Sequence, residues 1–191
     1  MIKYFFPREP LSSNHNFEGD KLSLDEARKM WLQILKQEMG LVALLDEDEN
    51  QFQIVGANIT GISHKSDKHD IKMKGEWEKI NKIINTITSE GNLFERYGVD
   101  SYLSAMGLSV HPEFHGLGLG LKLLECREKV CKHFNLKMTA TVFTAASSQH
   151  IAKKCGFHTI VEHEYRTYAI DGEILYPNLN GKISLMAKVY T

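Results

Sequence analysis

The chain has 191 residues, of which 42% are hydrophobic and 25% are charged. That length is enough to bury one core, so we expect a single domain over residues 1–191. The 23 basic and 24 acidic residues give a formal net charge of -1, and no basic block is longer than Lys153-Lys154, which argues against a nucleic-acid partner. No stretch approaches the roughly 20 apolar residues that span a bilayer, and the apolar start at residues 1–6 is too short for a signal peptide.

The cysteine and histidine patterns indicate neither disulfides nor a metal site. The three cysteines Cys126, Cys131 and Cys155 are odd in number and form no CxxC motif. We therefore expect free thiols in a reducing compartment, the cytoplasm. The histidines lack the HxxxH spacing with nearby acids that a metal site favours.

The first half of the chain predicts a helix, a hairpin and a second helix. Apolar residues recur at three- and four-residue spacing from Leu24 to Leu35, which is typical of an amphipathic helix. Two β-branched and apolar runs, Leu41–Leu45 and Gln53–Ile62, flank an acidic turn at residues 46–50 and predict a hairpin. A second amphipathic helix is expected over about Glu76–Thr88.

Two strands and a long helix are expected next. Tyr102–Val110 predicts a strand with a backbone bulge at Gly107. Leu119–Phe134 predicts one helix with an apolar face toward a sheet, and Met138–Phe143 predicts a buried strand. The expected helix face consists of Leu121, Leu124, Val130 and Phe134.

The remaining chain predicts one short helix and an antiparallel pair of strands. Ser147 or Ser148 is expected to cap the helix, which ends at residues 155–156. Thr159–Tyr168 and Ile183–Tyr190 alternate like paired strands around a loop. The element order predicts a mixed α/β or α+β sheet.

Three glycines alternate between the expected strand and helix, in the run His115-Gly116-Leu117-Gly118-Leu119-Gly120. Without side chains, successive backbone N–H groups can converge on an anion, and the helix dipole adds partial positive charge. A pyrophosphate suits such a loop, but the same glycines are compatible with a simple tight turn. The position past mid-chain argues against the dinucleotide-binding fingerprint, and there is no GxxxxGK[ST] sequence.

The run from Leu108 to Gly120 resembles the acetyl-CoA motif of the GNAT acetyltransferases, whose core is [Q/R]-x-x-G-x-[G/A]. A second segment, Ala152–Phe157, is similar to the family's helix that ends in Gly-Phe before the next strand. Two motifs at this separation are far more specific than either alone. The resemblance implies the GNAT fold, with a central, mostly antiparallel sheet flanked by helices, acetyl-CoA as cosubstrate and no metal.

Both ends of the chain are similar to insect arylalkylamine N-acetyltransferases of the dopamine-acetylating type. Phe5–Leu11 resembles their F-x-x-[D/R]-E-P-L segment, and Gly181–Val189 resembles their last strand, with its Met-Ala-Lys ending. The resemblance runs along most of the chain and is weakest between residues 20 and 90.

The resemblance also implies which residues bind acetyl-CoA: the end of the strand, the glycine loop and one serine of the following helix. Those residues are Leu108, Ser109, Val110, His115, Gly116, Leu117, Gly118, Leu119, Gly120 and Ser148.

Position by position, the family's general-base glutamate falls on Glu9, and its two hydroxyls fall on Thr144 and Ser148. An alkylamine is protonated at neutral pH, so a carboxylate must remove a proton, directly or through water, before nitrogen attacks the thioester. A hydroxyl near the departing sulfur can donate a hydrogen bond or a proton. Without the flanking match, Glu9 would be interpreted as an exposed carboxylate before a proline, and Ser148 also suits a helix N-cap.

The sequence departs from the family pattern at four places. Thr144 stands where the family usually has serine, and it keeps the hydroxyl but adds a methyl group. Position 152, where many relatives have a tyrosine general acid, is alanine, as in the insect enzymes. His115 replaces the usual arginine or glutamine at the head of the loop. The family's first strand and most of its first helix have no counterpart ahead of Glu9, so we expect either a truncated sequence or a sheet that lacks its first strand and has an open edge.

The sequence thus predicts an acetyl-CoA-dependent N-acetyltransferase that acts on a small amine of the dopamine, tyramine, serotonin or tryptamine class. Direct attack in a ternary complex is expected, since it needs no covalent intermediate on Cys155. A polyamine or an amino acid is the alternative acceptor, and a catalytically silent acyl-CoA-binding protein is the alternative from another class. The sequence predicts no oligomeric state.

Overall fold

The computed structural model of the chain describes residues 2–15, 17–48, 51–67 and 74–190. Its helices and short 3-10 turns are α1 (Pro10–Asn14), η1 (Phe17–Gly19), α2 (Lys21–Leu35), α3 (Glu76–Gly91), α4 (Leu93–Tyr97), η2 (Pro112–Phe114), α5 (Leu119–Glu125), α6 (Arg127–His133) and α7 (Ala146–Lys154). Its strands are β1 (Leu41–Asp48), β2 (Gln51–His64), β3 (Ser101–Val110), β4 (Met138–Phe143), β5 (His158–Glu164), β6 (Ala169–Ile170), β7 (Glu173–Ile174) and β8 (Lys182–Val189).

Six strands form one sheet in the order β1-β2-β3-β4-β8-β5. Every neighbouring pair is antiparallel except β3 and β4, which are parallel. β1 lies at one edge, and no strand in the described part of the chain pairs with its outer side. The small hairpin of β6 and β7 stands apart from this sheet. The expected mixed, mostly antiparallel fold class is confirmed.

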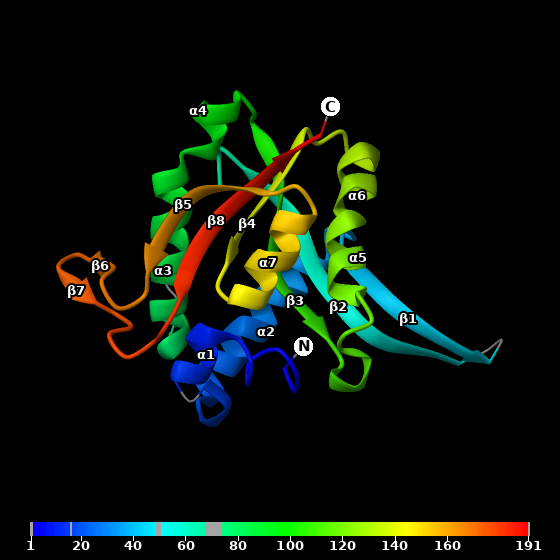
Figure 1. Ribbon diagram of the computed structural model, residues 1–191, viewed down its shortest axis with the longest axis horizontal. Coiled ribbons are helices and arrows are strands. Elements are labelled where there is room, and N and C mark those ends of the chain that lie inside the picture. Colours follow the sequence, from blue (N-terminus) through cyan, green and yellow to red (C-terminus); the bar gives the residue numbers. More distant parts are fainter. Residues whose placement is uncertain (1, 16, 49–50, 68–73, 191) are drawn as a thin grey trace.

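Helices cover both faces of the sheet (Figure 1). α2 and α3 pack on one face, and α5, α6 and α7 pack on the other. The larger core lies under α2 and α3 and includes Trp31, Ile80 and Leu185. A smaller core under α5 and α7 includes Leu124 and Phe157. β4, between these layers, is buried along most of its length, as its apolar sequence predicts.

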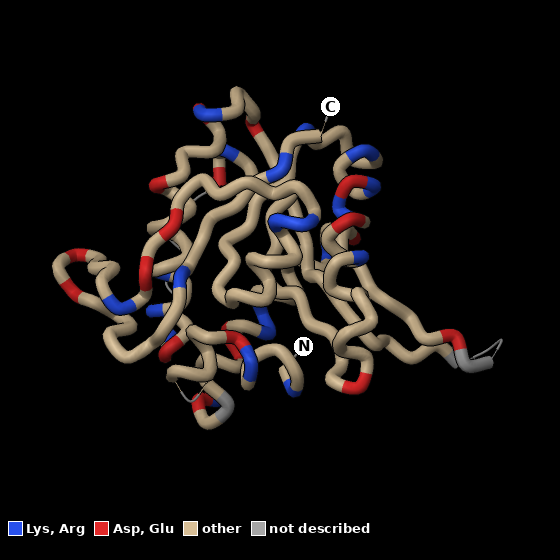
Figure 2. The backbone as a smooth tube through the Cα atoms, viewed as in Figure 1, with Lys and Arg blue, Asp and Glu red and all other residues tan. Residues whose placement is uncertain are grey.

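Acidic and basic residues are interspersed over the helices and loops (Figure 2). Along α5 and α6, opposite charges pair three or four residues apart, as in Lys122 with Glu125 and Glu128 with Lys132. This arrangement of mixed charge agrees with the formal net charge of -1.

The predicted first helix, hairpin, second helix and two central strands are all confirmed. β3 also contains the predicted bulge, because Met106 and Gly107 together face Ile59 of β2, and Gly107 has a φ of 131°. β1 and β2 pair as predicted, but residues 49–50 of the expected turn lie outside the described residues.

The single helix predicted over Leu119–Phe134 is wrong, since the structure has α5 and α6 with a tightened turn at Cys126. The N–H of Lys129 donates to the carbonyl of Cys126 at 3.1 Å, an i to i+3 bond of the 3-10 type. Phe134 follows the end of α6 and is 37% exposed, so it does not belong to the buried face.

Two further boundaries differ from the prediction. Neither serine caps α7, because its N-cap is Ala145, and Ser148 instead donates from Oγ to the carbonyl of Ala145 at 2.7 Å. β5 ends at Glu164, whose carbonyl accepts the N–H groups of Thr167 and Tyr168 in a turn.

Candidate active site

The sheet opens into a fork between β3 and β4. These parallel strands pair at Leu103 with Thr139 and then diverge. A cavity of about 410 Å³ lies in the fork, lined by residues 104–110 of β3 and residues 140–145 at the end of β4. Each strand keeps its outer partner, β2 or β8, so the sheet opens here without losing its other ladders.

Side chains satisfy the backbone at the bulge beside the cavity. Trp31 Nε1 donates to the carbonyl of Met106 at 2.7 Å, and Asn58 Nδ2 donates to the carbonyl of Gly107 at 2.9 Å. A buried carbonyl without a partner is costly, so these two contacts stabilise the bulge without a bond to β4.

The glycine loop leaves β3 at the open end of the fork and enters α5. Gly116 has a φ of 82° and Gly118 a φ of 76°, and a Cβ at either position would meet no atom within 4 Å. These two glycines are therefore required by the left-handed backbone and not by crowding. A Cβ at Gly120 would lie 3.2 Å from Cδ1 of Ile151, so this glycine allows α5 and α7 to approach closely.

The residues expected to bind acetyl-CoA divide into two groups. Leu108, Ser109, Val110, His115 and Ser148 line the cavity. Residues 116–120 are not among its lining residues and form the loop and the first turn of α5 beside the open end of the fork. The loop is thus a tight turn, and it also leaves open space around two of its glycines.

The N-terminal segment crosses to the end of β3 through two contacts. Arg8 Nη1 donates to Nδ1 of His115 at 3.1 Å, and Nε2 of His115 lies 2.9 Å from the carbonyl of Val110. This pattern suits an imidazole that carries its proton on Nε2. Tyr4 Oη and His111 Nε2 are also in contact, at 3.0 Å. The His115 ring thus faces Arg8 and β3, and a guanidinium sits next to the head of the loop.

Glu9 lies at the cavity as the N-cap of α1. Its Oε1 accepts from the N–H of Leu11 at 3.1 Å, and its Oε2 accepts from Ser12 N at 2.7 Å and Ser12 Oγ at 2.5 Å. The residue is 8% exposed, so the interpretation as an exposed carboxylate is wrong. A carboxylate offers about four acceptor sites, and these contacts leave room for a further donor.

Thr144 and Ser148 line the same cavity from the other side of the fork. The hydroxyl of Tyr165 donates to the carbonyl of Thr144 at 2.7 Å. Burial, with a smaller effect of the Glu9 charge, raises the pKa of Tyr165, which keeps this hydroxyl protonated as a donor. The structure therefore brings Glu9, Thr144 and Ser148 around one cavity, although 135 or more positions separate the first from the others in sequence.

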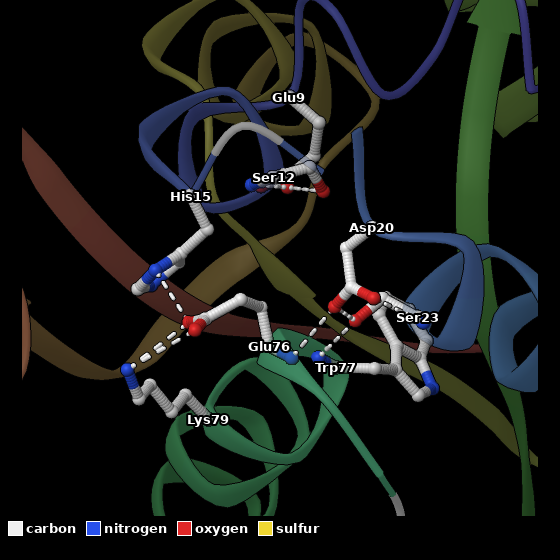
Figure 3. Close-up of polar contacts among 8 residues, drawn as sticks. All are labelled: Glu9, Ser12, His15, Asp20, Ser23, Glu76, Trp77 and Lys79. Atoms are coloured by element: carbon white, nitrogen blue, oxygen red, sulfur yellow. Dashed lines mark hydrogen bonds and ion pairs between the residues drawn. The ribbon is translucent and has the colours of Figure 1, made fainter. Parts of the chain in front are cut away.

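A polar cluster holds the N-terminal helices against α3 (Figure 3). Asp20 caps α2, pairs with the hydroxyl of Ser23 and accepts from the N–H of Glu76 at 3.2 Å. Ser23 Oγ in turn accepts from the N–H of Trp77 at 3.0 Å. The Ser23 hydroxyl bond, followed by the bond from Glu76, lowers the pKa of Asp20.

His15 completes the cluster at the end of α1. Its Nδ1 lies 2.8 Å from a carboxylate oxygen of Glu76, which also pairs with Lys79 at 3.0 Å (Figure 3). Burial lowers the pKa of His15, against the opposing charge of Glu76. Because Glu9 is the N-cap of α1, these contacts to α3 help to place the carboxylate at the cavity.

The sequence interpretation missed two charged lining residues, Arg8 and Arg127. Arg8 is adjacent to Glu9 in the segment that resembles the insect enzymes. The sequence therefore pointed to this segment but not to the contact of Arg8 with His115. Arg127 lies three residues after Leu124 and four before Cys131, which places it on the buried face of the helix. That spacing was the available signal.

The described residues add no other reactive centre to this cavity. Burial raises the pKa of Cys155, and it raises the pKa of Cys131 to about 12, so neither thiol is a ready nucleophile. The described chain holds no cluster of three potential metal ligands. None of its helices combines the length and apolar character that crossing a membrane requires.

Comparison with known proteins gives concordant results. The model of the acetyltransferase (GNAT) family matches residues 17–157. The structure named arylalkylamine N-acetyltransferase 7 from the yellow fever mosquito Aedes aegypti has a TM-score of 0.93 and 30% identity, covering 99% of this chain and 80% of that one. Arylalkylamine N-acetyltransferase 2 from Aedes aegypti has a TM-score of 0.82 and 28% identity, covering 97% and 89%.

A Drosophila melanogaster polyamine N-acetyltransferase has a TM-score of 0.82 at 18% identity, covering 99% of this chain and 91% of that one, which shows a shared fold alone. The family match spans both sequence motifs, and the first of them lies at the open end of the forked sheet. The chain belongs to the acetyltransferase (GNAT) family and is an acetyl-CoA-dependent N-acetyltransferase.

Proposed function

We propose that the chain, acting as one domain over residues 1–191, acetylates the primary amine of an arylalkylamine by direct attack in a ternary complex. The observation that carries the proposal is the cavity in the fork, which combines aromatic walls with a single acidic side chain among its described lining residues, Glu9. The two mosquito structures at 30% and 28% identity, both named for arylalkylamines, support it.

Aromatic side chains line the cavity on both sides of the fork. They are Tyr4, Phe5, Trp77, Tyr102 and Phe143. Such walls suit a substrate with one aromatic ring, because they bury its apolar surface. A polyamine would bring a second cation into the cavity, and an unpaired buried charge is strongly unfavourable. The lining therefore favours an arylalkylamine over a polyamine.

Glu9 is proposed as the general base. Its carboxylate keeps an acceptor position free beside the cavity, and the helix cap holds it in place through three hydrogen bonds. It receives a proton from the ammonium group, directly or through water. The neutral amine can then attack.

The acetyl donor is proposed to lie along β3, with its pyrophosphate at the glycine loop. Acetyl-CoA, when bound, supplies the activated thioester carbonyl. The loop N–H groups of residues 116–120 and the positive end of α5 suit the phosphates, and Arg8 places a cation beside the head of the loop. The hydroxyl of Thr144 is proposed to donate toward the departing sulfur. Ser148 is proposed to do the same after its single hydroxyl proton turns away from the carbonyl of Ala145.

Thiol release from acetyl-CoA over a panel of amines tests the proposal. Tryptamine, tyramine and dopamine should show kcat/KM at least about tenfold above agmatine, spermidine and glycine, the discrimination that a change in pocket contacts gives. A preference for the polyamines would overturn the acceptor class. Calorimetric binding of acetyl-CoA without turnover of any amine would favour a silent acyl-CoA-binding protein.

A further inference from the structure

Arg127 places a buried positive charge on the wall of the cavity. It begins α6, is 1% exposed and lines the cavity. Burial lowers the pKa of Arg127 to about 10, so the guanidinium remains charged at neutral pH. No carboxylate in the described part of the chain pairs with it, and its acceptors are neutral side chains.

The hydrogen bonds of Arg127 occupy only part of the guanidinium. Nε donates to Oδ1 of Asn58 at 2.8 Å, and Nη1 donates to Oγ1 of Thr141 at 2.8 Å and to Oγ1 of Thr139 at 3.5 Å. An arginine has five N–H donors, two of them on Nη2. The Nη2 donors find no protein acceptor among the described residues.

These contacts place Arg127 at the closed end of the fork. Asn58 also donates to the carbonyl of Gly107, and Thr139 Oγ1 donates to the carbonyl of Leu103 at 2.8 Å. Leu103 and Thr139 form the pair at which β3 and β4 part. Arg127 therefore joins β2 and β4 across β3 where the fork begins.

The proposed function fixes the direction in which an acyl-CoA lies in this fork. The glycine loop is at the open end, where it would hold the pyrophosphate. The acyl group then points inward, toward the pair formed by Leu103 and Thr139. Lengthening the acyl chain brings its end toward Arg127.

We propose that Arg127 sets the acyl-chain preference of the enzyme, admitting the acetyl group and rejecting longer apolar chains. Beside a two-carbon group, a water molecule can accept from the free guanidinium donors. A butyryl chain would displace that water with methylene groups, which leaves buried charged donors without partners. This inference rests on the proposed orientation of acyl-CoA in the fork.

The test compares the dissociation constants of acetyl-CoA and butyryl-CoA by calorimetry, without amine. The wild-type protein should bind butyryl-CoA at least about tenfold more weakly. Arg127→Met keeps a long unbranched side chain without charge. It should reduce the ratio of the two dissociation constants, butyryl-CoA over acetyl-CoA, by about tenfold. Arg127→Lys keeps a cationic side chain but not the planar guanidinium, so its ratio should lie between those of wild type and Arg127→Met. The exposed Arg166→Met is the matched control and should keep the wild-type ratio.

Two results would overturn the proposal. One is equal affinity of the wild-type protein for both acyl-CoAs, which needs no variant. The other is an Arg127→Met protein that retains the wild-type ratio. The ratio of the two dissociation constants does not depend on the fraction of folded protein. A loss of stability in a variant therefore cannot produce the expected change. Failure of the proposed acceptor class would appear separately, in the amine panel.

Discussion

Replacing Glu9 separates its proposed role as a base from its role as a helix cap. Glu9→Ala removes the acceptor of three hydrogen bonds and leaves the donors of Leu11 and Ser12 buried without it. Loss of a cap costs about 0.5 to 2 kcal/mol, and a buried unsatisfied donor costs about 1 to 3 kcal/mol. We expect Glu9→Ala to lower the free energy of unfolding by about 2 kcal/mol.

The catalytic effect should be larger than the loss of stability. Removal of a general base lowers kcat by about 10²- to 10⁴-fold, or roughly 3 to 5 kcal/mol in the activation barrier. The affinity for acetyl-CoA should stay nearly unchanged, because Glu9 lies apart from the glycine loop in the proposed arrangement. Glu9→Gln keeps one acceptor oxygen but cannot take the proton, so it should lose activity as Glu9→Ala does. It should lose about 1 kcal/mol of stability, because its amide NH2 leaves one buried donor unpaired.

Urea unfolding, steady-state thiol release and calorimetry measure these three quantities. Glu113→Ala serves as the control, since the Glu113 side chain is 81% exposed and its loss should change the unfolding free energy by less than about 0.5 kcal/mol. A Glu9→Gln protein with the turnover of wild type would refute the assignment of the base. Glu9 would then act only as the cap of α1.

Three further substitutions test the loop, the packing and the polar cluster. Gly118→Val forces a β-branched residue into a φ of 76°, so it should lower the free energy of unfolding by about 1 to 2 kcal/mol. Calorimetry should also show weaker acetyl-CoA binding, and unchanged affinity would argue against a phosphate site at the loop. In Gly91→Ala the new Cβ would lie 2.2 Å from Cδ2 of Leu185, which is 1% exposed, so overpacking should cost about 1 to 3 kcal/mol in urea unfolding; an equally stable variant would contradict this close packing. The lowered pKa of Asp20 means that its carboxylate stabilises the fold above its unfolded pKa of about 3.9 and loses this effect as pH falls through the folded pKa. The stability difference between wild type and Asp20→Ala should therefore be largest at neutral pH and shrink below about pH 4, whereas a constant difference between pH 7 and pH 2 would contradict the sign.

Local chemistry made several features predictable from the sequence. The spacing of apolar residues in Leu24–Leu35 and the alternation in β1 and β2 depend on helix and strand periods, which the chain carries at each position. The glycines at 107, 116 and 118 all have positive φ, which is what their places in a strand bulge and a loop before a helix require. Their spacing also indicated the family before any fold was known.

Features that depend on distant partners were not predictable in this way. Ser148 suits a helix N-cap by residue type, but the first turn of α7 is placed so that Ala145 occupies that position. Glu9 before Pro10 resembles a surface residue, yet packing of the N-terminal segment against α3 and the end of β3 buries it. Burial is a property of the assembled layers, and the sequence around a residue does not record it.

The sequence by itself determined most of the longer helices and strands, the two motifs and the family to which they belong. The tertiary structure decided where the cavity lies, because β3 and β4 part only when each has a firm partner on its other side. It also decided that Arg127, a residue type usually left in water, is held among Asn58, Thr139 and Thr141 from two different strands. Its charge can be buried only where acceptors from separate elements meet, and that meeting exists only in the folded chain.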